Sequence, residues 1–224
     1  TALSIVDCVT SLGACNVPVD EWELDVVASG SQKGYMIPPG LSFISMSQKA
    51  WEAAEKSNLP KFYLNLKSYR KSLLSNSNPY TPAVNLIFAL DEALKMMREE
   101  GLDNIFFRHN KHKLAVSNAT KALNLKLFAD EKYLSPSITA IKTGEMDAEE
   151  FRKTIKNNFD ILLAGGQDHL KGKIFRVGHL GYVNDRDIIT VVSAISNTLL
   201  SLGKITTQQA GEALAVVSKY LAGN

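Results

Sequence analysis

The sequence predicts an α/β protein, and three observations support this class. Short apolar runs that suit buried strands alternate with longer segments of helical periodicity along the 224 residues. Hydrophobic residues make up 45% and charged residues 21%, ordinary globular values that exclude a disordered, collagen-like or coiled-coil protein. No apolar run approaches the roughly 20 residues that span a bilayer. No basic segment opens the chain as it would a signal peptide.

Charge and cysteine usage exclude several classes of function. The 25 Lys and Arg residues nearly balance the 23 Asp and Glu residues, and a net charge of +2 is too small for an electrostatic nucleic-acid binder. We interpret the basic segment 108–113 as the solvated face of a helix. Cys8 and Cys15 are too few for a disulfide framework or a four-thiolate site, and we interpret His169 and His179 as structural residues. We therefore expect a cytoplasmic protein without metal, membrane or nucleic-acid partner.

The first hundred residues are predicted to form a strand-rich α/β region. Apolar runs predict strands at residues 3–6, 25–28 and 41–46. Eighteen residues (7–24) separate the first two strands, which is enough for the crossover of a parallel pair. Ser47 is expected to cap a short helix. A second helix follows Pro82 and ends at Gly101, with one buried face. That face comprises Ile87, Leu90, Leu94 and Met97.

The rest of the chain is predicted to form a small α+β domain with its helices on one face of a short sheet. Its strands are expected at residues 137–141, 161–163 and 174–177. Its helices are expected at residues 102–125, 147–156, 184–202 and 206–221. We therefore expect two domains, at residues 1–100 and 101–224.

Lys33 and Asp7 are the first candidates for chemistry. Lys33 follows an apolar strand within a Gly/Ser turn, and a neutral amine there would suit Schiff-base formation; the alternative is a lysine that extends out of the turn into solvent. Asp7 ends the first strand, where α/β sheets bind ligands; the alternative is an Asx turn that holds Thr10 or Ser11. Together they suit pyridoxal phosphate, with the amine on the aldehyde and the acid on the ring nitrogen.

Arg176 lies inside an apolar run. An arginine in such a place either pairs internally or binds an incoming carboxylate through two parallel hydrogen bonds. Strand alternation could equally place it on an exposed face. The residues alone leave these alternatives open.

Several segments together resemble a known family. They are Ile5-Val-Asp7-Cys-Val9-Thr-Ser11-Leu-Gly13, Asp25-Val-Val-Ala-Ser29-Gly-Ser-Gln32-Lys33, Pro38-Pro39-Gly40, Asn78-Pro-Tyr80-Thr81-Pro82, Glu100-Gly-Leu102, Arg108-His109 and Ile174-Phe-Arg176-Val-Gly178-His-Leu-Gly181. The series resembles the class V aminotransferases of fold type I, most closely the alanine–glyoxylate and serine–pyruvate/glyoxylate group. The resemblance covers essentially the whole chain, in family order.

The resemblance implies a fold, a cofactor and a reaction. Residues 1–100 would be the C-terminal part of the large domain that binds pyridoxal 5′-phosphate, with a mostly parallel sheet, and residues 101–224 the small C-terminal domain. The reaction would be transamination between a small amino acid, alanine or serine, and glyoxylate or pyruvate. The enzyme would be a homodimer.

The resemblance also implies roles for residues near the catalytic amine. Lys33 would be the Schiff-base lysine and the proton shuttle, and Asp7 would bond the pyridine nitrogen. Val9 would pack against the ring. Gln32 would contact the cofactor phosphate.

Three further roles follow from the resemblance. Thr81 would reach the phosphate of the other subunit's cofactor, and Arg176 would hold the substrate carboxylate. Many relatives have tyrosine three positions before the threonine. Here that position is Asn78, and the nearby Tyr80 is the candidate for the same phosphate contact.

The apolar start of the chain bears on its completeness. A buried parallel strand needs neighbours on both sides, so the sequence reads as if a half of the large domain preceded it; the alternative is a short strand that opens a small domain. We expect the C-terminal part of an aminotransferase: a fragment, a split enzyme with a partner chain, or a truncated module that keeps only the fold and dimerisation. We expect the chain alone to be an inefficient catalyst.

Two rival enzyme classes fit the residues poorly. A cysteine desulfurase needs a mobile cysteine in its C-terminal half, and no cysteine follows Cys15. Some members of the family have been named hydrogenase subunits, but nickel–iron chemistry needs soft thiolate ligands, usually in pairs. Cys8 and Cys15 do not supply them.

Overall fold

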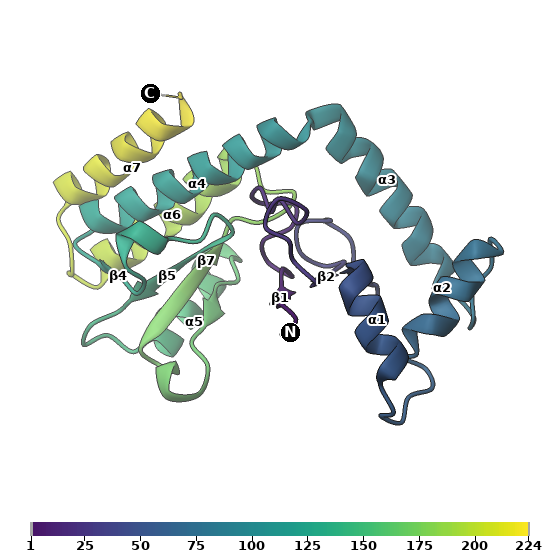
Figure 1. The fold of residues 1–224 in the computed structure, drawn as a ribbon. Coiled ribbons are helices and arrows are strands. Elements are labelled where there is room, and N and C mark those ends of the chain that lie inside the picture. Colours follow the sequence, from purple (N-terminus) through teal and green to yellow (C-terminus); the bar gives the residue numbers. More distant parts are fainter. Residues whose placement is uncertain (1, 224) are drawn as a thin grey trace. The chain divides into compact units, whose positions relative to one another are not determined.

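The computed structural model describes residues 2–223, which divide into two compact units (Figure 1). Unit 1 comprises residues 2–9 and 17–99, and unit 2 comprises residues 10–16 and 100–223. The mixed α/β class expected from the sequence is confirmed. Within residues 2–223, no helix combines the length and apolar character needed to cross a membrane.

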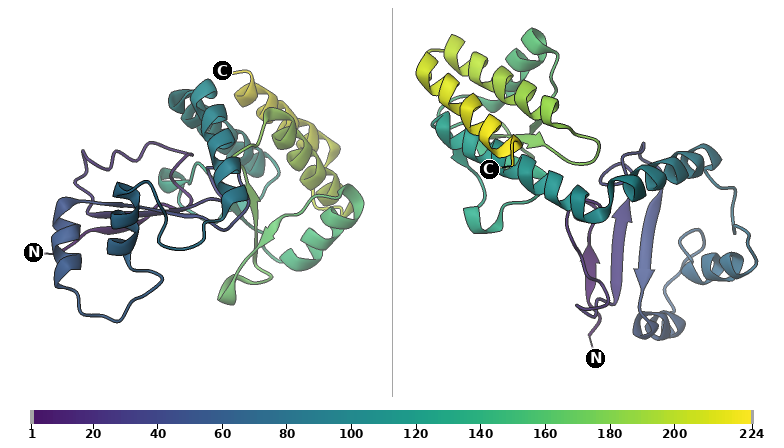
Figure 2. Two further views of the ribbon diagram at one scale, coloured as in Figure 1. Left: turned by 90° about the vertical axis from the view of Figure 1, so that its right-hand side faces the viewer. Right: turned by 90° about the horizontal axis from the view of Figure 1, so that it is seen from above.

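Unit 1 is built on a three-stranded sheet. Its strands are β1 (Ile5–Asp7), β2 (Val26–Gly30) and β3 (Ser42–Met46), which lie side by side in that order (Figure 2). β1 and β2 are parallel, with Asp7 opposite Ala28, so the expected crossover pair is confirmed. β3 returns antiparallel to β2. The two parallel strands therefore end at the same edge of the sheet.

Three helices complete unit 1. They are α1 (Gln48–Lys56), α2 (Leu66–Leu74) and α3 (Val84–Glu100). The predicted cap of α1 is confirmed, because the Ser47 side chain accepts from the Ala50 N–H. Helix α2, in which no residue is buried, was not expected from the sequence. The expected buried face of α3 is wrong at Ile87, which is 44% exposed because it lines an open hollow.

Unit 2 holds a four-stranded antiparallel sheet in the order β4-β5-β7-β6. The strands are β4 (Lys126–Leu127), β5 (Ile138–Lys142), β6 (Ala164–Gly165) and β7 (Ile174–Gly178). The strand expected at residues 161–163 is wrong, because the carbonyl of Leu163 accepts from Arg152 in a helix and pairing with β7 begins only at Ala164.

The helices of unit 2 are α4 (Leu102–Ala122), α5 (Ala148–Phe159), α6 (Asp185–Ser201) and α7 (Thr207–Leu221). Short 3₁₀ turns lie at Glu131–Tyr133 and Asp168–Leu170. Asn184 and Thr206 begin α6 and α7 with reciprocal side-chain caps. Helices α4, α6 and α7 pack against one another (Figure 1).

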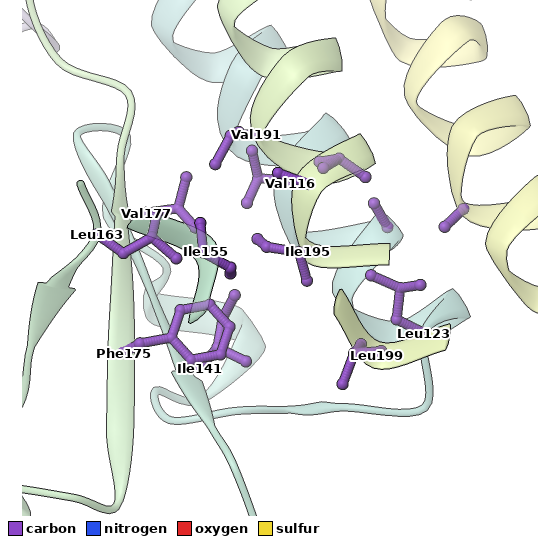
Figure 3. Close-up of a cluster of buried hydrophobic side chains, with 14 of the residues drawn as sticks. Val116, Leu123, Ile141, Ile155, Leu163, Phe175, Val177, Val191, Ile195 and Leu199 are labelled. Atoms are coloured by element: carbon purple, nitrogen blue, oxygen red, sulfur yellow. The ribbon is translucent and has the colours of Figure 1, made fainter. Parts of the chain in front are cut away.

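The core of unit 2 lies between this sheet and its helices (Figure 3). Phe175 of β7 is fully buried and its ring lies 5.1 Å from that of Phe151 in α5. Complete burial of one such side chain contributes about 1.5–3 kcal/mol, whereas an exposed ion pair contributes about 0–1 kcal/mol. Apolar packing therefore holds unit 2 together more than its surface ion pairs do.

The segment 108–113 corrects one expectation. It is not a solvated face: His109 and His112 are fully buried. The His109 ring bonds the carbonyl oxygen of Ile105 at 2.8 Å and lies 3.1 Å from the backbone nitrogen of Gly181. His112 bonds Asp185 at 2.9 Å. Burial lowers the pKa of both rings and outweighs their hydrogen bonds. These histidines are structural contacts of α4.

Asp25 ties three elements of unit 1 together. Its carboxylate accepts hydrogen bonds from the Ser4 N–H at 2.9 Å, the Ser47 hydroxyl at 2.8 Å and the Lys49 ammonium at 2.8 Å. Lys49 also bonds the Ala2 carbonyl. The side chain therefore joins the start of β2 to the segment before β1 and to the start of α1. These hydrogen bonds lower the pKa of Asp25 from 3.8 to about 2. The bond from Lys49 has the largest effect, followed by those from Ser4 and Ser47.

This geometry predicts an acid dependence for unit 1. Because the pKa of Asp25 is lowered on folding, its contribution to stability is complete above pH 4 and is lost as the pH falls toward about 2. We expect Asp25→Asn to lower Tm at pH 7 and to lower it less as the pH approaches 2. Thermal unfolding followed by circular dichroism measures this, with the exposed carboxylate variant Asp20→Asn as the control. An equal Tm difference at pH 7 and pH 2.5 would contradict the assignment.

Candidate functional site

The candidate site lies where β1 and β2 end. Asp7 is the last residue of β1, and Lys33 follows Gly30, the last residue of β2, by three positions. Because the two strands are parallel, both residues lie at one edge of the sheet. We call this edge, formed by Asp7, Val9, Gly30, Gln32 and Lys33, the lysine edge.

Gly30 sits in close contact with two other members of the lysine edge. A Cβ atom on Gly30 would lie 3.0 Å from Oε1 of Gln32 and 3.7 Å from Cγ1 of Val9. The bare backbone therefore lets the amide of Gln32 and the methyl group of Val9 approach β2 closely. The structure brings these three members of the lysine edge together.

The turn that carries Lys33, residues 31–40, is closed by one buried serine. Ser31 is fully buried, and its hydroxyl donates to the Pro38 carbonyl at 2.8 Å and accepts from the Leu41 N–H at 3.1 Å. Its backbone N–H donates to the Leu41 carbonyl at 3.1 Å. Within the turn, the Met36 N–H donates to the Lys33 carbonyl. Lys33 therefore projects from a closed turn.

Asp7 and Lys33 differ in the hydrogen bonds that their side chains form. Oδ1 of Asp7 accepts from the Val9 N–H at 2.8 Å, which is an Asx turn, although with Val9 and not with Thr10 or Ser11. Oδ2 forms no hydrogen bond within residues 2–223. Lys33 is half-buried, and its ammonium has no hydrogen bond or ion pair among the residues described. Both groups keep an atom for a ligand.

Cys8 lies between Asp7 and Val9 but faces the interior. It is 3% exposed, and burial, followed by the neighbouring Asp7 charge, raises the pKa of its thiol. A buried thiol of raised pKa is a poor nucleophile. The lysine is therefore the candidate nucleophile at this edge.

Tyr80 and Thr81 lie in a different hollow of unit 1. The hollow has a volume of about 460 Å³ and is also lined by residues of the Lys33 turn, Gly40 and Leu41. Tyr80 donates its hydroxyl hydrogen to the Phe62 carbonyl at 2.9 Å and packs within an aromatic cluster. Thr81 is exposed. The structure does not join these two residues to Asp7 in one pocket.

Arg176 belongs to unit 2, on the half-buried side of β7. Its neighbours Phe175 and Val177 enter the core, so alternation directs Arg176 to the other face. Its Nε donates to the Gly165 carbonyl at 2.9 Å. The terminal nitrogens form no further hydrogen bond within residues 2–223. The side chain is partly anchored, and its two terminal N–H pairs remain for a carboxylate.

Two contributions were missed by sequence reasoning. The turn-closing hydrogen bonds of Ser31 are one of them, because they join residues that are seven and ten positions apart. Gly165, whose carbonyl anchors Arg176, was not singled out, although the consecutive glycines 165 and 166 indicate close backbone packing.

The closed turn generates a prediction. Ser31→Ala leaves the partly buried Leu41 N–H and the Pro38 carbonyl without the Ser31 hydroxyl, so we expect a loss of about 1–3 kcal/mol in the free energy of unfolding. Urea unfolding measures this loss, with Ser42→Ala, an exposed serine of β3, as the control. Equal stability of the two variants would show that the hydroxyl does not close the turn.

Comparison with known proteins places the chain in a family. The family model of the class-V aminotransferases matches residues 1–177. A serine–glyoxylate aminotransferase of Methylorubrum extorquens is 35% identical over 230 residues, which cover 100% of this chain and 57% of that protein. A Synechococcus protein named as the small subunit of a soluble hydrogenase is 57% identical over 220 residues, covering 98% of this chain and 57% of that protein.

A solved structure extends the comparison to the fold. The ureidoglycine–glyoxylate aminotransferase of Bacillus subtilis superposes with a TM-score of 0.88 at 31% identity, over 97% of this chain and 58% of that chain. The chain thus spans about half the length of the curated relatives it matches.

Residues 2–223 contain no group of three His, Cys, Asp or Glu side chains that could hold a metal ion. The aminotransferases of the matched family, in contrast, use pyridoxal phosphate. The fold and the family match agree with the resemblance seen in the sequence: the chain belongs to the class-V aminotransferase family.

Proposed function

We propose that the protein carrying this chain is a pyridoxal-phosphate transaminase that exchanges the amino group of a small amino acid, alanine or serine, with glyoxylate or pyruvate. The observation that carries the proposal is the lysine edge. A carboxylate and an amine lie there where two parallel strands end, and the amine has no hydrogen bond or ion pair within residues 2–223. The relatives named serine–glyoxylate aminotransferase support the substrate class.

The residues of the lysine edge fit this cofactor. A planar ring needs an apolar contact and a carboxylate for its nitrogen, and Val9 and Asp7 offer both. The absence of a Cβ on Gly30 lets the Gln32 and Val9 side chains lie close to the end of β2, where the cofactor would be held. When bound, pyridoxal phosphate supplies an aldehyde that condenses with amines and a ring that withdraws electrons from the reacting carbon.

The chain's own residues then divide the work. With the cofactor bound, the Nζ of Lys33 in its neutral amine form would take up the proton that leaves the α-carbon of the amino acid. Within residues 2–223, this Nζ forms no hydrogen bond or ion pair that would hold it elsewhere. The free Oδ2 of Asp7 accepts the hydrogen bond of the ring N–H, while Oδ1 stays bound to the Val9 N–H and fixes the orientation of the carboxylate.

Phosphate contacts are assigned to the polar residues around the Lys33 turn. The amide N–H of Gln32 would donate a hydrogen bond to the phosphate of the cofactor bound in the same subunit. Thr81, with Tyr80 beside it, reaches the phosphate of the second subunit in a homodimer. Exposed apolar side chains of unit 1, among them Phe62 and Leu64 at 80% and 77% exposure, support an interface on this unit.

Arg176 is proposed to bind the carboxylate of the amino acid or the oxo acid. Its Nε is fixed on Gly165, and the two terminal nitrogens match the two oxygens of a carboxylate.

The two units are assigned to two domains of the enzyme. We assign the region of residues 1–100 to the C-terminal part of the cofactor-binding domain and residues 101–224 to the small domain. We place the reaction in the cytoplasm, in line with a sequence that offers no disulfide framework. The hydrogenase name of the Synechococcus relative is not carried over, because the proposed site consists of an amine and carboxylate rather than thiolates.

The experiment is transamination of L-serine and L-alanine with glyoxylate, measured for the wild type and Lys33→Ala. We expect kcat to fall by roughly 10²–10⁴-fold in the variant, because the proton acceptor is lost. Added methylamine should restore part of the rate. Lys56→Ala, which removes an exposed lysine at the end of α1, is the matched control and should keep full activity.

Two results would contradict the proposal. A Lys33→Ala variant as fast as the wild type would exclude the amine as the proton acceptor. A wild-type protein that dimerises and binds no cofactor would instead be a module that keeps the fold alone.

A further inference from the structure

We propose that Arg152 is a positioning residue for Arg176 and acts on it through the backbone of Gly165. The inference rests on the proposed function, in which Arg176 binds the substrate carboxylate. It assigns to α5 and β6 a part in substrate affinity. All residues involved belong to unit 2.

The first step is the hydrogen bond that orients Arg176. Its Nε donates to the carbonyl of Gly165 at 2.9 Å, across the β6–β7 pair in which Ala164 lies opposite Arg176. An arginine side chain has several freely rotating bonds, and this contact fixes its far end near β6. The place of the guanidinium therefore depends on the position of the Gly165 carbonyl.

β6 itself is only two residues long, so its own ladder holds it weakly. Arg152 of α5 supplies the additional anchor: its Nε donates to the Leu163 carbonyl at 2.7 Å, directly before the strand. Its Nη1 pairs with Glu149 one turn earlier at 2.7 Å. The guanidinium thus spans from α5 to the start of β6.

Gly165 completes the contact because it has no side chain. A Cβ atom there would lie 2.5 Å from Nη1 of Arg152 and 2.7 Å from Oε1 of Glu149. Any larger residue would therefore displace the guanidinium from β6. Gly165 faces Arg152 with its Cα and Arg176 with its carbonyl, and this connects the two arginines.

The charges around the two arginines assign different tasks to them. Arg152 is neutralised by Glu149, whereas Arg176 has no carboxylate partner within the described part of the chain. An incoming carboxylate is therefore bound by Arg176, and Arg152 holds the strand that orients it.

The test compares two variants of α5 in the protein that carries this chain. Arg152→Met removes the side chain that anchors β6. Lys153→Met is the control, because it removes one positive charge from the neighbouring, exposed position. The Nζ of Lys153 lies 3.9 Å from Glu150, so this ion pair is loose. We expect Arg152→Met to raise KM for L-serine and glyoxylate about tenfold with kcat nearly unchanged, because the lost binding is equal in the ground and transition states. Lys153→Met should keep both constants. Arg152→Lys, which keeps a donor for Leu163, should recover part of the affinity.

A second pair of variants tests the glycine. Gly165→Ala should raise KM as Arg152→Met does, because the new methyl group displaces the guanidinium. Gly178→Ala, which adds a methyl group at the end of β7 where nothing lies within 4 Å, is the control. If both variants act on one contact, Gly165→Ala combined with Arg152→Met should be no worse than either alone.

The outcomes separate this inference from the proposed function. If Arg176→Gln leaves KM unchanged, or if the wild type shows no turnover and no binding of glyoxylate in calorimetry, the carboxylate role fails and the inference with it. If Arg176→Gln raises KM but Arg152→Met behaves like Lys153→Met, the inference alone is overturned. A crystal structure of Arg152→Met adds a readout without turnover: an intact Nε bond from Arg176 to Gly165 would also overturn it.

Discussion

The carboxylate of Asp25 holds unit 1 in the arrangement on which the candidate site depends. It lies directly before β2, and its bonds to Ser4 and Ser47 fix the segment before β1 and the start of α1. With the amino ends of the two strands joined in this way, the strands run in parallel register to the opposite edge. Asp7 and Lys33 emerge there. Asp25 and the lysine edge thus lie at opposite ends of the β1–β2 strand pair.

Chemistry at that edge follows from what the fold leaves unpaired. A buried polar group is normally satisfied by hydrogen bonds, and Ser31 follows this rule with each of its polar groups. Among the residues that the structure describes, the half-buried Lys33 ammonium and Oδ2 of the exposed Asp7 form no hydrogen bond, and in unit 2 the terminal nitrogens of Arg176 form none. These are the groups that a cofactor aldehyde, a ring nitrogen and a substrate carboxylate require. In unit 2, Arg152 forms an ion pair with Glu149, whereas Arg176 has no carboxylate partner among the described residues.

Much of this was readable from the sequence because local signals carried it. Ser47, Asn184 and Thr206 predicted the starts of helices, and apolar runs predicted β1, β2 and β7. Lys33 and Asp7 are candidates from the sequence because Lys33 follows a strand within a turn of small and polar residues and Asp7 ends a strand before such a turn. The family was identified from the order of short segments, and the family match agrees.

The features that the sequence did not reveal depend on contacts between distant residues. Helix α2 buries no residue, so it has no apolar face that a pattern could show. The burial of His109 depends on Gly181, 72 positions away, and looked like surface charge in sequence. Strand β6 was misplaced because Leu163 bonds to a helix. The roles of the site residues are proposed from their geometry together with the resemblance.

Whether Lys33 holds the cofactor is measured by the intact mass of the protein before and after borohydride reduction in the presence of pyridoxal phosphate, with the modified peptide sequenced. Borohydride fixes the cofactor on the lysine that holds it. The account predicts a gain of one pyridoxyl-phosphate group on Lys33 and on no other lysine. An unmodified Lys33, or a label spread over surface lysines, would contradict the assignment of the lysine edge as the cofactor site.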